Sequence, residues 1–352
     1  MKFMHISDVH LGVKPDAGKA WSEKRAQDIW DSFAEMIEIA AEESPDFLLI
    51  SGDLFHKQPL KRELKEVCGL FARIPQTKVL LMAGNHDYIQ QNSFYRSCEW
   101  TKNVYFFPRE EVTCFDFEGQ NVAVYGLSYW HREIRETMYD DIIPQNPNRI
   151  NILLAHGGDE KHIPFSAEKL VKHGFDYVAA GHIHKGAQLV PGRAVMAGAL
   201  EPTDCNDTGP HGYWLGTLDK TKCDVSFYPI RKCEYCHEII TVTPETTEYE
   251  VMQGMKALLE ERPSYQYFRI CLQGYKDPDV TYDIKRLSAL ERIVDVSEQL
   301  HPDYHYEKLL AEHENSLLGA YIKAMQKKGQ DAVSAKALEY GVSALLGHEI
   351  CR

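Results

Sequence analysis

The chain has 352 residues, enough to bury a sizeable core divided among two or three domains. Its formal net charge of -13 at pH 7 argues against a stand-alone, non-specific DNA-binding protein, because phosphate contacts need clustered Lys and Arg. Nine scattered cysteines favour reduced thiols over a disulfide framework. A strand-like segment begins at Lys2 and no apolar run approaches the length of a membrane span, so we expect a cytoplasmic protein without a signal peptide or membrane contact.

Five short apolar segments predict buried strands of a parallel sheet, because each is too short for a helix. The segments are 3–7, 48–51, 79–83, 152–155 and 177–180. Residues that bind divalent metals follow each of them. Because the carboxyl ends of strands form the ligand crevice of an open α/β sheet, we expect these residues to converge. The candidate ligands are Asp8, His10, Asp53, Asn85, His156, His182 and His184.

Seven ligands are more than one ion can take, but they suit two ions that share a bridge. Oxygen and imidazole ligands without thiolate favour manganese, iron or zinc. A pair of ions roughly 3.5 to 4 Å apart is typical of phosphatases and nucleases. Asp53 lies in the middle of the series and is the predicted bridge. The alternative, in which these are ordinary capping and core residues, needs five independent coincidences at strand ends.

Amphipathic helices are predicted between these strands, at 22–43, 59–73 and 93–100. Ser22 is the predicted cap of the first helix. A further strand is predicted at 122–126. These elements complete a pattern of alternating strands and helices.

Arg132 follows the last of these strands. Together with His131 and Arg135 it could hold a phosphate or stack on a base. The alternative is that the neighbouring Tyr129 and Trp130 simply cover the core. The sequence leaves both readings open.

Short alternating segments at 195–198, 212–218 and 223–230 predict antiparallel strands that close a second sheet, giving a two-sheet sandwich. Residues 233–237 match the C-x-x-C-H pattern of haem attachment. We treat this match as coincidence, because such attachment needs export and a zinc ribbon would need a second cysteine pair.

Beyond residue 231 the order strand, helix, strand, helix, strand predicts a small α/β unit. Its expected elements are 238–242, 248–261, 267–272, 283–292 and 293–296. Past Pro302 the tail is predicted to be helical, and its apolar faces need a partner in the enzyme body or in another protein. We therefore expect a catalytic domain at 1–231, a capping domain at 232–301 and a helical tail at 302–352 that would dock a partner.

The order D-x-H, G-D, G-N-H-D, H-G, G-H-x-H resembles that of the calcineurin-like metallophosphoesterases. The resemblance implies an α/β sandwich of two sheets flanked by helices, with two metal sites. One site would be formed by Asp8, His10, Asp53 and His184. The other would be formed by Asp53, Asn85, His156 and His182. It also implies that His86 acts on the substrate or leaving group, and that His211, in a loop like the family's substrate-side loop, contacts phosphate.

Within this superfamily the chain is most similar to SbcD-type DNA repair exonucleases, including the shorter bacterial relatives called YhaO. This resemblance covers the predicted catalytic domain and implies manganese ions, a DNA substrate, and a homodimer formed through the helices at 59–73 and 93–100. It further implies a tail that docks on the coiled coil of an SbcC-type ATPase. In such nucleases the position of His56 affects processive exonuclease action more than internal cleavage. The alternative is that His56 caps the following helix.

We therefore predict a two-metal phosphodiesterase, a DNA exonuclease that hydrolyses phosphodiester bonds with a metal-activated water. His86 would protonate or orient the leaving oxygen. One alternative is a phosphatase or cyclic-nucleotide phosphodiesterase of the same superfamily. Another is a non-catalytic scaffold whose metals only hold its fold.

Overall fold

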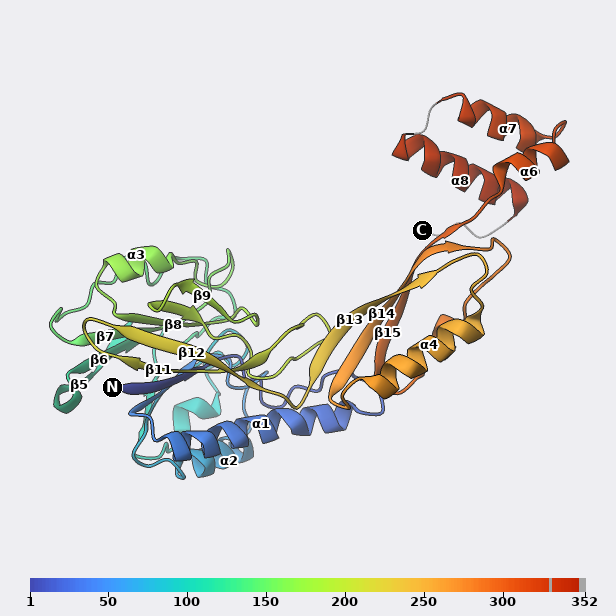
Figure 1. The fold of residues 1–352 in the computed structure, drawn as a ribbon. Helices are drawn as coiled ribbons and strands as arrows, with labels where there is room; N and C mark the ends of the chain where they lie inside the picture. Colours follow the sequence, from blue (N-terminus) through green and yellow to red (C-terminus); the bar gives the residue numbers. More distant parts are fainter. Residues whose placement is uncertain (329–330, 348–352) are drawn as a thin grey trace. The chain divides into compact units, whose positions relative to one another are not determined.

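The computed structural model describes residues 1–328 and 331–347. The chain divides into two compact units, Met1–Tyr235 and Cys236–Arg352, and each has its own hydrophobic core (Figure 1). The predicted boundaries at residues 231 and 301 stay a prediction, and the end of the predicted tail, 348–352, lies outside the described residues. Within the described part of the chain, no helix is both long enough and apolar enough to cross a membrane.

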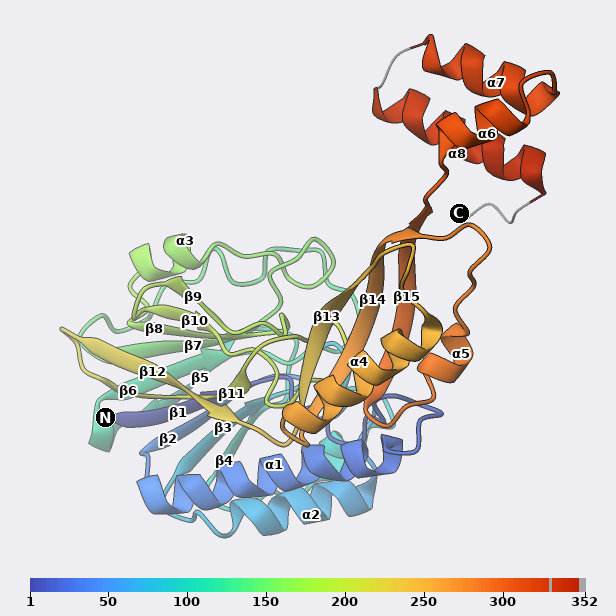
Figure 2. The ribbon, with the colours of Figure 1, turned by 45° about the vertical axis from the view of Figure 1, so that its right-hand side comes forward.

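Two six-stranded sheets form the first unit (Figure 2). The first sheet has the order β12-β11-β1-β2-β3-β4. Its strands are β1 (Lys2–Ile6), β2 (Phe47–Ser51), β3 (Lys78–Met82), β4 (Val104–Phe107), β11 (His211–Leu218) and β12 (Cys223–Ile230). β1 to β4 run parallel, and β11 pairs antiparallel with β1 and β12. Helices therefore carry the chain back between the parallel strands.

The second sheet has the order β5-β6-β7-β8-β10-β9. Its strands are β5 (Thr113–Phe117), β6 (Val122–Gly126), β7 (Ile150–His156), β8 (Tyr177–Gly181), β9 (Ala187–Val190) and β10 (Ala194–Met196). The inner strands β6, β7, β8 and β10 are parallel, whereas β5 and β9 pair antiparallel at the edges. Two short elements, the 3-10 turn η2 (Glu118–Gln120) and the helix α3 (Ala167–Lys172), lie in its connections.

Side-chain alternation in the strands fills two cores at once. In β2, Leu49 packs into the core between the two sheets, whereas Leu48 packs on the opposite face with side chains of α1 (Ser22–Glu43) and α2 (Lys61–Phe71). Because both faces are covered, the strand is apolar from Phe47 to Ile50. Phe33 of α1 is fully buried in this outer core, which confirms the predicted amphipathic helix.

Several local predictions are corrected. Trp21, not Ser22, is the N-cap of α1, because the Ser22 hydroxyl donates to the carbonyl of Pro15 instead. The helix predicted at 93–100 is only the 3-10 turn η1 (Phe94–Ser97), whose cap is Ser93. Both errors concern helix ends, where a hydroxyl has several competing backbone partners.

The strands predicted to close the second sheet divide between the two sheets. β10 joins β8 in the second sheet and runs parallel to it, whereas β11 and β12 extend the first sheet from the edge of β1. The alternation of apolar and polar residues predicted these strands correctly, but it contains no information about which sheet edge they join. The two-sheet α/β sandwich itself is confirmed.

The second unit contains a three-stranded sheet with the order β13-β14-β15. Its elements are β13 (Glu234–Val242), α4 (Glu248–Glu261), β14 (Gln266–Lys276), α5 (Ile284–Leu287) and β15 (Ile293–Pro302). Their order confirms the predicted strand, helix, strand, helix, strand pattern, although α5 is a single turn rather than the predicted 283–292. β14 and β15 are parallel and longer than predicted.

Three helices follow in the same unit, α6 (Tyr306–Glu312), α7 (Leu317–Gln326) and α8 (Ala332–Leu346). They form a small cluster in which Ile322 and Val342 are fully buried. The apolar faces that the sequence left without a partner thus pack largely on one another.

Candidate metal centre

All seven candidate ligands lie at the carboxyl ends of strands or in the loops directly after them, with both sheets contributing. Asp8 and His10 follow β1, Asp53 follows β2, Asn85 follows β3, His156 ends β7, and His182 and His184 follow β8. The structure brings their ligand atoms together, as the strand pattern predicted. Their role as metal ligands is a proposal that rests on the following geometry.

The first group of ligand atoms comes from Asp8, His10 and His184, within 4.8 Å of one another. His10 Nε2 lies 3.0 Å from His184 Nε2 and 4.0 Å from Asp8 Oδ1. Asp8 Oδ1 is buried and has no hydrogen-bond partner among the described atoms. A buried carboxylate oxygen without a partner is costly unless a cation satisfies it, so this group fits a metal ion.

The second group centres on the side-chain oxygen of Asn85. This oxygen lies 2.9 Å from His156 Nε2 and 3.1 Å from His182 Nδ1. Asp53 Oδ2 lies 3.4 Å from His156 Nε2 and 3.8 Å from His10 Nε2, so one carboxylate oxygen faces both groups. This position suits a bridge between two ions.

Hydrogen bonds on the outer side of the rings fix which nitrogen of His156 and His184 faces the site. His156 Nδ1 donates to the carbonyl of Ser51 at 2.8 Å, and His184 Nδ1 donates to Asp207 Oδ2 at 2.9 Å. In each neutral ring the lone pair of Nε2 then points inward, ready for a cation. Burial alone lowers the pKa of both rings, but Asp53 and Asp207 outweigh it and raise each pKa to about 9.

Asp159 fixes which nitrogen of the His182 ring faces the site. Its Oδ2 accepts a hydrogen bond from His182 Nε2 at 2.8 Å, which leaves Nδ1 directed at Asn85. His162 Nδ1 lies 2.9 Å from both carboxylate oxygens and holds Asp159 from its other side. Burial raises the pKa of Asp159, but its hydrogen bonds with His162 and His182 hold it well below the usual range.

Asp159 and Asp207 were not predicted from the sequence. Both lie in loops that follow a metal motif, three residues after His156 and 23 residues after His184 respectively. No strand pattern marks such positions, and acidic residues are common in loops. Only the weak expectation that a metal-binding imidazole has an oxygen partner could have led to them.

Backbone strain is concentrated at the candidate ligands. Asp8, His10, Asp53 and His182 have φ angles of 49°, 52°, 51° and 103°, in the left-handed region that favours glycine. Residues in such conformations cluster at functional sites, where the surrounding structure imposes them. The strain therefore supports a functional role for these positions.

Two glycines allow the strand ends to approach one another. A Cβ on Gly84 would lie 2.2 Å from Asp53 Oδ1 and 2.7 Å from His156 Nε2. A Cβ on Gly52 would lie 2.4 Å from His156 Nδ1, and Gly52 has a φ of 90°. Any larger residue at these positions would push His156 out of place.

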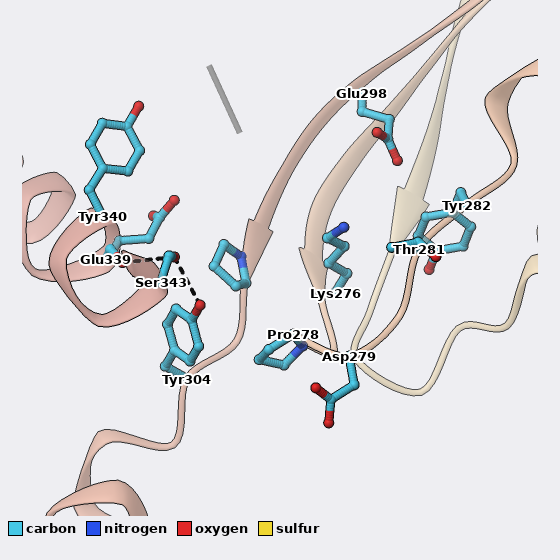
Figure 3. A pocket seen from close by; sticks show the side chains of 11 residues that line it. Lys276, Pro278, Asp279, Thr281, Tyr282, Glu298, Tyr304, Glu339, Tyr340 and Ser343 are labelled. Atoms are coloured by element: carbon cyan, nitrogen blue, oxygen red, sulfur yellow. Dashed lines mark hydrogen bonds between the residues drawn. The ribbon is translucent and has the colours of Figure 1, made fainter. Parts of the chain in front are cut away.

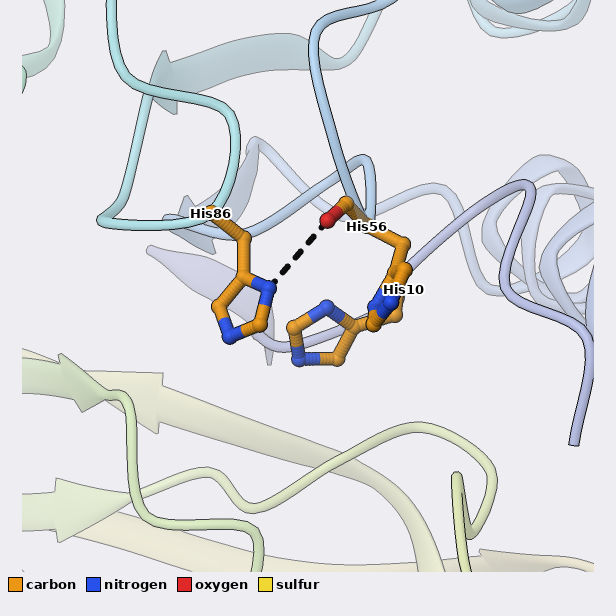
Figure 4. Close-up of side chains that lie close together, drawn as sticks. All are labelled: His10, His56 and His86. Atoms are coloured by element: carbon orange, nitrogen blue, oxygen red, sulfur yellow. Dashed lines mark hydrogen bonds between the residues drawn. The ribbon is translucent and has the colours of Figure 1, made fainter. Parts of the chain in front are cut away.

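His86 and His56 lie beside His10 at the edge of this site (Figure 4). The ring centroid of His86 is 4.7 Å from that of His10 and 5.1 Å from that of His56. The backbone N–H of His86 donates to Asp53 Oδ1 at 2.9 Å, and its ring Nδ1 lies 3.1 Å from the carbonyl of His56. Leu60 is the N-cap of α2, so the alternative in which His56 caps that helix is wrong.

The two predicted substrate-binding residues are placed differently. Arg132 is exposed in the loop after β6. His211 is buried, and its ring nitrogens lie 3.1 Å from the carbonyls of Ala199 and Asp207. In this arrangement both ring nitrogens of His211 face backbone carbonyls, one of them in the loop of Asp207. Both substrate contacts stay predictions.

The two aromatic neighbours of Arg132 differ in burial: one lies in the core and the other at the surface. Tyr129 is fully buried and its hydroxyl donates to the carbonyl of His156 at 2.8 Å, so it supports the site from the core. Trp130 lies at the surface, where the Arg96 guanidinium stacks 4.8 Å from its ring.

A pocket of about 450 Å³ lies in the second unit (Figure 3). Its lining includes Lys276, Glu298, Tyr304 and Glu339, and none of the candidate ligands. Its carboxylates make it an unsuitable site for a phosphate ester. The chemistry of the chain is therefore expected at the strand ends of the first unit.

This fold and site define a phosphoesterase that uses divalent metals. Residues 1–186 match the family described as calcineurin-like phosphoesterase, and the chain belongs to that family. The resemblance noted in the sequence is thereby confirmed, and the chain is a metal-dependent phosphoesterase. The non-catalytic scaffold is accordingly set aside.

The relatives that the chain resembles include a bacterial metallophosphoesterase and two archaeal Mre11 proteins. The chain is 28% identical over 300 residues to the uncharacterized metallophosphoesterase YhaO of Bacillus subtilis (strain 168), across 78% of this chain and 72% of YhaO. It is 30% identical over 258 residues to the DNA double-strand break repair protein Mre11 of Methanocaldococcus jannaschii, across 69% of each chain. It is 29% identical over 242 residues to the Mre11 protein of Methanococcus maripaludis, across 62% of this chain and 63% of that protein.

Proposed function

We propose that this chain is a two-metal nuclease that hydrolyses DNA phosphodiester bonds, acting chiefly from duplex ends. The observation that carries the proposal is a double ligand group sharing Asp53, with His86 and His56 directly beside it. The names of the Mre11 relatives support DNA as the substrate.

The residues divide naturally between two ions. One ion would be held by Asp8, His10, Asp53 and His184. The other would be held by Asp53, Asn85, His156 and His182. The bound ions would supply Lewis-acid activation of water and neutralise charge on the phosphate. Manganese is the proposed metal, because the donor set consists of imidazole nitrogen and oxygen without thiolate.

The protein's own part in the reaction falls mainly to His86. Its backbone N–H fixes it to Asp53, and its Nδ1 faces the carbonyl of His56, so that Nε2 is the nitrogen available to a substrate. A proton held at Nε2 can pass to the leaving oxygen. His56, whose ring lies 5.5 Å from that of His10, would guide a strand that enters from a duplex end.

Finer assignments follow the same proposal. A homodimer formed through α2 and η1 and a coiled-coil ATPase docked on the tail helices rest on the similarity to SbcD-type nucleases, whereas a cytoplasmic location rests on the sequence expectations given above. Exposed apolar side chains on α7 and α8, Leu317 and Val333, give such a partner a surface to contact. Deleting residues 302–352 should leave hydrolysis of small esters intact but abolish binding of such an ATPase. Loss of small-ester hydrolysis in that truncated chain would contradict a separate tail.

Substrate class is tested with manganese-loaded protein on three substrates. Hydrolysis of bis-p-nitrophenyl phosphate and of end-labelled duplex DNA, with little activity on p-nitrophenyl phosphate, is the expected result. Asp53→Asn should lose both ions together and all hydrolysis, because it removes the shared charge. A preference for the monoester would favour the phosphatase alternative, and two ions bound to Asp53→Asn would contradict the bridge.

A further inference from the structure

Two cysteines that are distant in the sequence lie side by side in the first unit. Cys68 is on α2 and Cys98 directly follows η1 as its C-cap, and their Sγ atoms are 3.9 Å apart. Both side chains are partly buried. We propose that Cys68 and Cys98 form a peroxide-sensitive dithiol, which converts reversibly to an intramolecular disulfide.

The segments that carry the two cysteines are anchored in the core. On α2, Val67 directly precedes Cys68 and Phe71 lies one turn after it, and both are fully buried. On the other side, Tyr95 of η1 is buried and its hydroxyl donates to Asp87 Oδ2 at 2.6 Å. The sulfur atoms must approach by about 1.8 Å to reach the S–S bond length of about 2.05 Å.

In the single chain, without the homodimer proposed through α2 and η1, the pair is accessible to a small oxidant. Both cysteines line a surface groove of about 370 Å³, together with Lys61, Lys65 and Phe94. A peroxide is far smaller than this groove. The two lysines place positive charge along it, and positive charge favours a thiolate over a thiol.

The two thiols differ in reactivity because they share a hydrogen bond. Donation from the Cys98 thiol stabilises a thiolate at Cys68 against the opposing effect of burial, and lowers the pKa of Cys68 to about 7. The same hydrogen bond, together with burial, raises the pKa of Cys98. Local charge points the same way, because Lys65 lies one turn before Cys68 on α2 whereas the Glu99 carboxylate directly follows Cys98. Cys68 is therefore the thiol that meets peroxide first, and Cys98 is the thiol that resolves the product.

The chemistry balances with one peroxide. The Cys68 thiolate attacks one peroxide oxygen, the O–O bond breaks, and Cys68 sulfenic acid and hydroxide form. The Cys98 thiol then attacks the sulfenic sulfur, forming the S–S bond and expelling the sulfenic hydroxyl, which takes up the Cys98 proton and leaves as water. The hydroxide from the first step takes up the proton that Cys68 released when it ionised. Two thiols lose two electrons in total, and the peroxide is reduced to two molecules of water.

The disulfide would tie α2 to the segment after η1. The chain between the two cysteines contains β3 and the loop of Asn85, His86 and Asp87. Oxidation would thus place this loop within a covalent ring formed by the disulfide and the chain from Cys68 to Cys98. The inference concerns the thiols alone and does not depend on the proposed nuclease activity.

The test uses the full-length chain treated with hydrogen peroxide and digested without reduction. Mass spectrometry should find a peptide pair joined through Cys68 and Cys98, and the protein should lose two of its nine thiols and regain them with dithiothreitol. In Cys98→Ser, Cys68 should stop at the sulfenic acid and react with dimedone. In the matched control Cys114→Ser, which alters a partly buried cysteine of β5, the linked peptide should persist.

Two results would overturn the proposal. One is oxidation of other cysteines in the wild-type protein without a linked Cys68–Cys98 peptide. The other is a disulfide that appears only between two chains, detected as a dimer on non-reducing gels. Because the wild-type protein gives the decisive measurement, a variant that fails to fold does not weaken the test.

Discussion

The carboxylates behind His184 and His182 should control metal affinity, and removing their charges tests this directly. Asp207→Asn and Asp159→Asn keep the shape of each side chain and a carbonyl oxygen that can still accept a hydrogen bond. They remove the negative charge that makes the facing imidazole a stronger ligand. Outer partners of metal-binding histidines typically contribute about 10- to 100-fold to metal affinity.

The structure ranks the two substitutions. The Asp207 side chain is 14% exposed and also accepts hydrogen bonds from the N–H and hydroxyl of Thr203, whereas that of Asp159 is 43% exposed. Solvent screens an exposed charge more strongly. We therefore expect Asp207→Asn to weaken binding toward the ~100-fold end of that range and Asp159→Asn toward the ~10-fold end.

Calorimetric titration with Mn²⁺ measures both affinities without relying on catalysis. Asp204→Asn is the matched control, because Asp204 lies in the same loop as Asp207, is exposed, and its side chain accepts a local hydrogen bond from the N–H of Asn206 rather than from a candidate ligand. Its affinity should equal that of the wild-type protein. Unchanged affinity in Asp207→Asn, or a larger loss in Asp159→Asn, would refute the reasoning.

Three other predictions follow from the site and its surroundings. Titration of Mn²⁺ in buffers with different ionisation enthalpies should show proton release at pH 7, and the affinity for Mn²⁺ should rise up to about pH 9. The reason is that His156 and His184 carry a raised pKa without ions and must lose their protons to bind them. Binding heats that do not depend on the buffer would contradict this. His86→Ala should keep both ions but abolish turnover, whereas His56→Ala should slow digestion from duplex ends and leave nicking intact; equal loss of both activities in His56→Ala would remove the distinction. Arg25→Met should lower the free energy of unfolding by about 3 kcal/mol in urea titrations, because it leaves the buried Glu201 and Asp28 without their cation. A urea midpoint equal to that of the wild type would show that the Arg25 ion pairs do not stabilise the fold.

The convergence of the candidate ligands could be predicted because it depends on a regularity of parallel sheets. Each candidate ligand directly follows a short apolar segment, and parallel strands present their carboxyl ends at one edge. Local sequence was therefore sufficient to place Asp53 and His156 in one site, although 103 residues separate them. Which strands pair at the outer edges, as for β11 and β12, depends on tertiary packing and was predicted less well.

The carboxylates that accept hydrogen bonds from the ligand histidines could not be predicted, because no repeating sequence pattern marks them. Asp207 reaches His184 from a loop after β10, and Asp159 reaches His182 across another loop. Loop paths depend on the packing of the whole unit rather than on a repeating pattern. The same holds for Arg25, which is fully buried on a helix whose pattern predicted only its apolar face.

The strained backbone at the site depends on the buried strands that precede the candidate ligands. Each left-handed residue costs about 1 to 3 kcal/mol, so Asp8, His10 and Asp53 keep their conformations only if neighbouring structure enforces them. The ends of β1 and β2 provide this: the N–H of Asp8 donates to the carbonyl of Gly52 at 3.1 Å, and that of His10 to the carbonyl of Asp53 at 3.0 Å. These hydrogen bonds hold only while both strands stay buried on both faces. The apolar segments that revealed the site in the sequence are therefore also what maintains its strained geometry.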